Sequence, residues 1–223
     1  MGQKLKPSGK VKGRAGRSAR SSRVYIGVGS NKGNRGRNIR KALRLLQEQQ
    51  GIDLEAVSPF YETRPDGGPP GQRNFWNGVV RIRSAWPSRR LLGILKKVEA
   101  RVGRRPGKRW AAREVDLDIL VRGREVVRTK RLSVPHLRMK DRAFVLRPLS
   151  DLAPGLRDPV THMTVAQCLR RVSGRRRFAD KKRVAEFLYI RGQKPRPLGR
   201  GGRLAAKYVV RRGTPGFSPG GTP

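Results

Sequence analysis

The sequence predicts an α+β domain in which helices are layered against a mostly antiparallel sheet. Segments with the two-residue period of a strand alternate with segments that have the 3.6-residue period of a helix. The strand segments are short and several are separated only by turn residues, which favours hairpins over the helical crossovers of a doubly wound parallel sheet. Neither GxGxxG at the start of a helix nor GxxxxGK followed by Ser or Thr occurs in the chain, so both of these phosphate loops are absent.

The first expected elements are a strand at 24–31 and a helix at about 34–50. The strand is an apolar run that ends in Gly-Ser-Asn, and the helix has large apolar residues at i, i+4 and i+7 with a glycine just beyond its end. A second strand is expected at 53–62, with an interruption at Pro59. The glycines and prolines of 64–73 then predict a loop.

A strand at 75–83 and a helix at 88–102 come next. Alternation along the strand places an aromatic and an amide side chain on one face. The helix has apolar residues at helical spacing, and Ser88 is expected to be its N-cap. A loop rich in glycine and arginine follows at 103–113, and it leads into a strand at 114–121.

Strand 114–121 alternates without a break between apolar and polar residues. Its apolar members are expected to face the core: Val115, Leu117, Ile119 and Val121. Its acidic members face the other way: Glu114, Asp116 and Asp118. The remaining expected elements are a tight turn at 122–123 into a strand at 125–128, a short helical segment near 139–142, the apolar segment 144–146, a small helix at 164–171 and one further element at 184–190.

Charge is concentrated at both ends of the chain. The 223 residues include 54 Lys and Arg against 15 Asp and Glu, for a net charge of +39. Residues 1–23 contain eight basic and no acidic residues, and 173–223 contain 14 basic and two acidic residues. We therefore expect disordered basic tails around one domain at 24–172. Nonspecific contact of the tails with nucleic acid and simple solvation of the charges are both open alternatives.

Composition also excludes two classes of protein. No segment approaches the roughly 18–20 consecutive apolar residues that a membrane-spanning helix needs, so no membrane partner is expected. Cys168 is the only cysteine, which excludes a secreted fold held by internal disulfides. A reducing compartment is the simpler interpretation, and we expect a cytoplasmic protein.

Asp116 and Asp118 form the most informative pair in the sequence. Two residues apart on a strand, their carboxylates lie on one face about 6–7 Å apart. At an effective dielectric constant of about 20 they repel each other by roughly 2–3 kcal/mol, which a bound cation would offset. Mg²⁺ prefers such oxygen ligands and completes its shell with water and phosphate. The alternative is a solvent-facing strand edge with two exposed acids.

Basic and aromatic residues flank the acidic pair in sequence. They are Arg104, Arg109, Trp110 and Arg113 upstream, and His136 and Arg142 downstream. Guanidinium groups pair with phosphate oxygens, and tryptophan offers a flat face to an aromatic base. Together with the acids, these residues indicate a nucleoside triphosphate site. A salt-bridge network without a ligand is the alternative.

A second cluster follows the loop at 64–73. Phe75 and Asn77 share one strand face, and together they offer stacking and in-plane hydrogen bonds to a flat heterocycle. An ordinary half-buried strand is the alternative for this cluster taken alone.

These residues, in this order, resemble the 6-hydroxymethyl-7,8-dihydropterin pyrophosphokinase family over about residues 24–170. The matching segments are 29–31, 60–63, 75–77, 109–120, 134–136 and 139–149. The resemblance implies a ferredoxin-like α+β domain and an ATP-dependent transferase of folate biosynthesis. The implied reaction moves the pyrophosphoryl group of ATP to the hydroxymethyl group of 6-hydroxymethyl-7,8-dihydropterin and gives AMP and the pterin diphosphate.

The resemblance also implies a role for each candidate residue. Asp116 and Asp118 would hold two Mg²⁺ ions against the triphosphate. The residues expected to bind ATP are Arg109, Trp110, Arg113, Ile119, His136 and Arg142. Those expected to bind the pterin are Thr63, Phe75, Asn77 and Phe144. The expected catalytic residues are Arg104, Arg113, Asp116 and Asp118, and none of them is a strong general base.

A non-catalytic RNA- or ribosome-associated protein that retains this fold is the alternative function. The joint presence of the acidic pair with Asn77, Phe144 and His136 favours the enzyme, since a scaffold has no use for all of them. The charge of the tails favours an additional contact with a polyanion.

Overall fold

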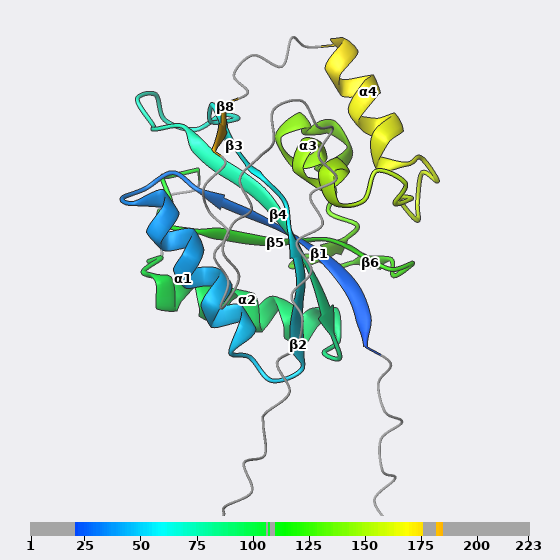
Figure 1. Ribbon diagram of the computed structural model, residues 1–223, viewed down its shortest axis with the longest axis horizontal. Coiled ribbons are helices and arrows are strands. Elements are labelled where there is room, and N and C mark those ends of the chain that lie inside the picture. The colour runs from blue at the N-terminus through cyan, green and yellow to red at the C-terminus, as the bar shows by residue number, and fades with distance from the viewer. Residues whose placement is uncertain (1–20, 106, 108–109, 176–181, 185–223) are drawn as a thin grey trace, which may run out of the picture.

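The computed structural model describes residues 21–105, 107, 110–175 and 182–184. Its elements follow the chain in this order: β1 (Ser22–Ser30), α1 (Arg35–Gln47), β2 (Ile52–Val57), β3 (Phe60–Thr63), β4 (Phe75–Ser84), α2 (Ser88–Val102), β5 (Asp116–Arg122), β6 (Val127–Arg128), β7 (Ser133–Val134), the 3₁₀ turn η1 (Met139–Asp141), α3 (Ala143–Leu152), α4 (Val165–Arg175) and β8 (Lys182–Val184). Within this part of the chain, helices cover both faces of one antiparallel sheet (Figure 1). The predicted α+β layering is confirmed.

The sheet has the order β5-β1-β4-β3-β8, and β2 pairs with β4 beside β3. The predicted interruption at Pro59 separates β2 from β3, and both strands pair with β4. Ser58 maintains the break, because its Oγ accepts the Val79 N–H at 2.8 Å. With β2 and β3 taken together, the chain runs strand-helix-strand-strand-helix-strand and the last strand lies beside the first. This is the expected ferredoxin-like arrangement.

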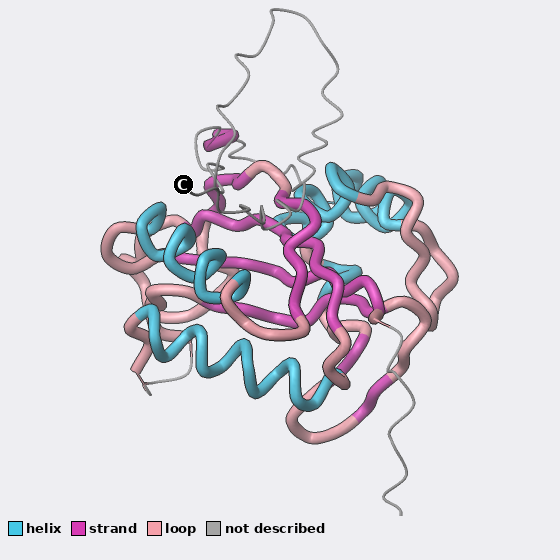
Figure 2. The backbone as a smooth tube through the Cα atoms, turned by 60° about the horizontal axis from the view of Figure 1, so that its bottom comes forward, coloured by secondary structure: helices cyan, strands magenta, loops and turns pink. Residues whose placement is uncertain are grey.

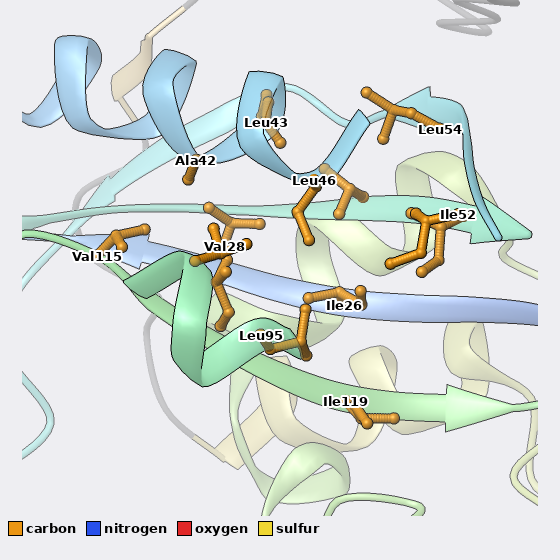
Figure 3. Packing of buried hydrophobic residues seen from close by; sticks show 14 of the residues in the cluster. Ile26, Val28, Ala42, Leu43, Leu46, Ile52, Leu54, Leu95, Val115 and Ile119 are labelled. Atoms are coloured by element: carbon orange, nitrogen blue, oxygen red, sulfur yellow. The ribbon is translucent and has the colours of Figure 1, made fainter. Parts of the chain in front are cut away.

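A first hydrophobic core lies between the sheet and helices α1 and α2 (Figure 3). Figures 1 and 2 both show these two helices side by side on one face. The predicted apolar positions of α1, Ile39, Leu43 and Leu46, are all buried. The helix begins after Asn34, whose side chain accepts the Arg37 N–H at 3.0 Å, and it ends at Gln47, earlier than expected.

A second core lies on the opposite face, beneath α3 and α4. It contains Leu146 and Leu149 of α3, Val165 and Cys168 of α4, and Val79 of β4. The sheet is therefore buried on both faces, so a side chain on either face reaches solvent only where the covering helices leave an opening. The candidate site occupies such an opening.

One side-chain direction in β5 differs from the prediction. Val121 was expected to face the first core with Leu117 and Ile119, but it packs in the second core. The cause is a β-bulge: Tyr25 of β1 pairs with Val121 and the next residue, Ile26, pairs with Ile119. The extra residue between them reverses the alternation beyond it.

One further expectation about local structure is wrong, and two segments differ in extent or were not assigned. Ser88 is the first residue of α2 and not its N-cap, and its hydroxyl donates to Glu125 at 2.8 Å. The segment 144–146 belongs to α3, a helix that the sequence analysis did not assign. The turn at 122–123 is present, but the strand that follows it is only β6, which pairs with β7.

The tail expected at 173–223 is not wholly without structure. Residues 182–184 form β8, which pairs with β3 at the edge of the sheet. Of the arm expected at 1–23, residues 22–23 begin β1 instead. Residues 1–20 of that arm, the other residues of the expected tail beyond 175 and most of the element expected at 184–190 lie outside the described residues. None of the described helices combines the length and apolar character needed to cross a bilayer.

Candidate active site

A cleft of about 280 Å³ opens on the α3 face of the sheet, opposite α1 and α2. Its walls come from β1, β4, β5, the start of α3 and the loops before β4 and β5. The cleft brings together most of the predicted site residues: Phe75, Asn77, Trp110, Arg113, Asp116, Asp118, His136, Arg142 and Phe144. Residues separated by up to 69 positions in the chain therefore share one opening.

The aspartate pair lies on β5 with both carboxylates toward this cleft. In the antiparallel register, Asp116 lies opposite Gly29 of β1, and Asp118 lies opposite Gly27. Both glycines line the cleft. A Cβ atom on Gly29 would lie only 2.8 Å from Oδ1 of Asn77. In the sequence, Gly29 is only part of a matching segment, because its spatial role depends on the partner strands.

Asp116 is held between two arginines. Its Oδ1 accepts a hydrogen bond from Arg104 Nη1 at 2.6 Å, and its Oδ2 accepts one from Arg113 Nη1 at 2.5 Å. Burial acts to raise the pKa of this carboxyl, but the charges of Arg113 and Arg104 outweigh it, so the pKa lies below its usual range. Asp116 is ionised at neutral pH.

Asp118 has the opposite environment. Burial and then the negative charge of Asp116 raise the pKa of its carboxyl, although Lys96 and His136 oppose the change. Burial also lowers the pKa of His136, so that its imidazole is neutral at physiological pH. No described side chain donates a hydrogen bond to Asp118. The pair therefore combines Asp116, a carboxylate held by two arginines, with Asp118, whose ionised form a nearby cation would stabilise.

The other half of the cleft is lined by Phe75, Asn77 and Phe144. The Asn77 Nδ2 donates to Thr63 Oγ1 at 2.8 Å, which fixes the orientation of the amide. Thr63 itself is buried beneath Asn77 and does not line the cleft. The predicted aromatic and amide pair is thus present and rigidly supported.

The loops before β4 and β5 meet over the cleft. Gln72 Nε2 donates to the carbonyl of Trp110 at 3.0 Å, and a Cβ on Gly68 would lie 2.8 Å from that same carbonyl oxygen. The Trp110 backbone has a φ of 70°, and Arg138 lies over its ring, 5.3 Å from the centroid. The indole therefore forms part of the cover of the cleft.

Asn31 connects these loops, and sequence reasoning gave it no role. It is 1% exposed, and its Nδ2 donates to Gln72 Oε1 at 3.1 Å. Its Oδ1 accepts the Arg113 N–H at 2.7 Å. A polar residue directly after an apolar strand, within a matching segment, was the available signal, because a buried amide must find partners.

Arg142 lies at the mouth between the two halves of the cleft. Its Nε is 3.4 Å from a carboxylate oxygen of Asp66, and its guanidinium lies 5.4 Å from the centroid of the Phe144 ring. Burial, together with the charge of Arg138, lowers the pKa of Arg142. Its expected place between the two substrates stays a prediction.

Besides Thr63, two predicted site residues have side chains outside the cleft lining. Ile119 packs in the first core, on the face of β5 opposite to Asp118, so its side chain does not line the cleft. Arg104 also lies outside the cleft lining, since its guanidinium pairs with Glu99 and Asp116. Arg109 lies outside the described residues.

The chain is similar to known proteins of one family over the residues that form the cleft. A family model described as 7,8-dihydro-6-hydroxymethylpterin-pyrophosphokinase matches residues 25–154. The chain belongs to this family. The match includes every residue of the cleft, and it confirms both the family and the pyrophosphokinase class that the sequence predicted.

Curated relatives in bacteria carry the name 2-amino-4-hydroxy-6-hydroxymethyldihydropteridine pyrophosphokinase. The Pseudomonas aeruginosa protein is 42% identical over 137 residues, which are 61% of this chain and 84% of that protein. The Bacillus subtilis protein is 36% identical over 166 residues, which are 74% of this chain and 96% of that protein.

Solved structures agree in fold. Wild-type Plasmodium falciparum HPPK-DHPS with STZ-DHP aligns with a TM-score of 0.57 at 14% identity, over 73% of this chain and 46% of that chain. The chain thus spans less than half of that longer protein. At this identity the likeness supports the pyrophosphokinase family's fold alone.

Proposed function

We propose that this chain transfers the pyrophosphoryl group of ATP to the hydroxymethyl oxygen of 6-hydroxymethyl-7,8-dihydropterin, giving AMP and the pterin diphosphate for folate synthesis. The observation that carries the proposal is that the aspartate pair, Asn77 and Phe144 line one cleft in a member of the pyrophosphokinase family. Curated relatives with this name support the same reaction.

The residues present fit a magnesium site. Asp116 is ionised, and Asp118 is a carboxylate without a described hydrogen-bond donor beside a like charge. No group of three or more His, Cys, Asp or Glu side chains suited to a metal occurs among the described residues, so an ion here needs oxygens from water and the triphosphate. We propose that the two aspartates hold two Mg²⁺ ions, which when bound neutralise charge on the phosphates.

The triphosphate would lie between the aspartates and the hydrogen-bond donors on this side of the cleft. Arg113, His136 and Arg142 line the cleft on this side, and they supply hydrogen bonds to phosphate oxygens. We propose that Arg109 also donates hydrogen bonds to phosphate oxygens. Trp110 covers the nucleotide and excludes water, since its loop already contacts the loop before β4.

The pterin would lie between the rings of Phe75 and Phe144. Asn77 reads the edge of the heterocycle through in-plane hydrogen bonds, and Thr63 acts by holding the Asn77 amide in orientation. Gly29 provides the space that this amide occupies.

The reaction forms a bond from the pterin hydroxymethyl oxygen to the β-phosphorus and breaks the bond between that phosphorus and the α–β bridging oxygen. No cleft residue stands out as a strong general base. Phosphoryl transfer depends mainly on in-line positioning and stabilisation of charge, which this arrangement of arginines and carboxylates supplies.

Release of AMP from ATP, measured with and without the pterin alcohol, tests this function. We expect AMP only when pterin and Mg²⁺ are both present, and a loss of at least about a hundredfold in Asp118→Ala. AMP formation that ignores the pterin, or an unchanged rate in Asp118→Ala, would rule the proposal out.

A non-catalytic RNA- or ribosome-associated protein remains the second candidate, and the net charge of +39 favours it. It predicts no AMP and co-purification with nucleic acid that high salt releases. Nonspecific nucleic-acid contact through the tails can also accompany catalysis. Deleting residues 1–20, which precede β1, should then reduce nucleic-acid retention and leave AMP release unchanged. The single cysteine still favours a reducing, cytoplasmic location.

A further inference from the structure

Glu99 of α2 is a buried carboxylate that the proposed reaction does not use. Its side chain is only 3% exposed, and it does not line the cleft. A buried charge is costly unless it is well paired, and removing only one partner of a buried ion pair leaves the other charge uncompensated. The contacts that Glu99 makes therefore indicate what it does.

Those contacts converge on the aspartate pair. Oε1 of Glu99 accepts the backbone N–H of Leu117, the residue between the two aspartates, at 2.7 Å. Oε2 accepts Arg104 Nη1 at 2.5 Å, and the same nitrogen donates to Asp116 Oδ1 at 2.6 Å. Glu99 is thus connected to the backbone between the aspartates and, through one guanidinium, to the first of them.

We propose that Glu99 is a positioning residue for the magnesium site, which sets the charge that Asp116 and Asp118 present and holds the peptide between them. The proposal rests on the proposed function, because it takes the aspartate pair to be the metal ligands.

The net charge around the aspartate pair predicts how loss of the Glu99 charge should change the affinity for Mg²⁺. Three carboxylates and three cations make up this cluster: Glu99, Asp116 and Asp118 with Lys96, Arg104 and Arg113. Without the charge of Glu99 the cluster has one excess positive charge. Arg104 then pairs with Asp116 alone and binds it more strongly. Mg²⁺ must therefore compete with Arg104 for the Asp116 carboxylate.

The test is calorimetric titration of Mg²⁺ into the full chain saturated with the α,β-methylene analogue of ATP. Glu99→Gln keeps an acceptor for the Leu117 N–H, and it removes the charge together with the oxygen that accepts from Arg104. We expect the Mg²⁺ dissociation constant to rise at least about tenfold in this variant. AMP release should require correspondingly more Mg²⁺ and recover when Mg²⁺ is saturating.

A second substitution separates the electrostatic role from a structural one. Lys96 Nζ donates to Glu99 Oε1 at 2.7 Å and is partly exposed. Glu99→Gln combined with Lys96→Gln restores the charge balance, so Mg²⁺ affinity should return to within about threefold of the unchanged chain. Lys96→Gln alone should tighten Mg²⁺ binding, which tests the proposal even if the Glu99 variant fails to fold.

Val98→Ala is the matched structural control. Val98 is a neighbouring buried residue of α2 that packs in the first core and contacts no member of the cluster through a hydrogen bond. It should lower the melting temperature and leave Mg²⁺ affinity within about twofold.

The outcomes are distinguishable. If Glu99→Gln binds Mg²⁺ as tightly as the unchanged chain, or if Lys96→Gln fails to restore the affinity that Glu99→Gln loses, the positioning role is wrong while the proposed function stands. If the unchanged chain itself binds no Mg²⁺ with the nucleotide analogue, both fail.

Discussion

The Oδ1 atom of Asn31 accepts the backbone N–H of Arg113 at 2.7 Å and joins the end of β1 to the segment that enters β5. The backbone N–H of Asn31 donates back to the carbonyl of Arg113 at 3.1 Å. Through its Nδ2 the same side chain reaches Gln72 in the loop before β4. One buried amide thus connects the β1 end to both loops that cover the cleft.

Asn31→Ala should lower stability by about 1–3 kcal/mol, because it leaves buried polar partners unsatisfied. It should also raise the KM for ATP, since Arg113 loses one of the bonds that fix its backbone. Urea unfolding and steady-state kinetics measure the two effects. Asn38→Ala is the control: that amide donates to the Lys32 carbonyl at 2.9 Å at an exposed site, and its loss should leave KM unchanged.

Gly29→Ala should weaken pterin binding more than ATP binding. The new Cβ would lie 2.8 Å from Asn77 Oδ1 and would displace the amide from its bond to Thr63. We expect the KM for the pterin alcohol to rise about tenfold, as for the loss of one good hydrogen bond, and the KM for ATP to change less than about threefold.

Gly93→Ala provides the comparison for that result. Nothing lies within 4 Å of a Cβ at Gly93, and alanine favours the helical conformation of α2. It should therefore raise stability by about 0.5–1 kcal/mol and leave both KM values unchanged. Equal changes in the two KM values of Gly29→Ala would contradict the assignment of Asn77 to the pterin.

The parts of the site that depend on local periodicity were predictable from the sequence. Asp116 and Asp118 share a face because strand side chains alternate, and the same rule placed Phe75 and Asn77 together. The direction of Val121 was not predictable in this way, since the bulge in β5 is a property of its pairing with β1 at Tyr25. The residue pattern within one strand does not show how that strand pairs with its neighbour.

Features that depend on tertiary partners were missed for a similar reason. Asn31 reads as a turn residue after a strand, and only the folded chain shows that its amide serves two distant loops. Ser88 has the residue type of an N-cap, but Glu125 takes its hydroxyl. Helix α3 contains Pro148, which reduces the helical signal of its sequence.

Ile119→Val tests the placement of Ile119 in the core and not in the nucleotide site. The side chain packs under α1 and α2, so shortening it should cost about 0.5–1.5 kcal/mol of stability. The KM for ATP should stay within about twofold. Ile26→Val, at the residue that pairs with Ile119, should behave in the same way. A selective rise in the KM for ATP in Ile119→Val would show that this side chain does contact the nucleotide.

Asp118→Asn should stabilise the metal-free chain at neutral pH while abolishing AMP release. Burial and Asp116 raise the pKa of Asp118 in the folded chain above its unfolded value of about 3.9, so the ionised carboxylate opposes folding. This cost to folding stability is absent at a pH below the pKa of Asp118 in the unfolded chain, and it is fully present above the pKa of Asp118 in the folded chain. We expect the substitution to add about 2–3 kcal/mol at pH 7, which is the repulsion between two such carboxylates.

The pH dependence distinguishes this effect from general stabilisation. As pH falls toward about 4, Asp118 becomes protonated in the unchanged chain, and the difference between the two proteins should vanish. The ionised Asp116 carboxylate has the opposite effect on stability. Arg113 and Arg104 lower the pKa of Asp116 against the effect of burial, so Asp116 stabilises the folded chain above its unfolded pKa, and this stabilisation is lost only at more acid pH. Urea unfolding without Mg²⁺ at pH 7 and at about pH 4 measures the Asp118 effect, and a further measurement at about pH 3 measures the Asp116 effect. An Asp118→Asn chain no more stable than the unchanged one at pH 7 would show that Asp118 is already compensated by other charges.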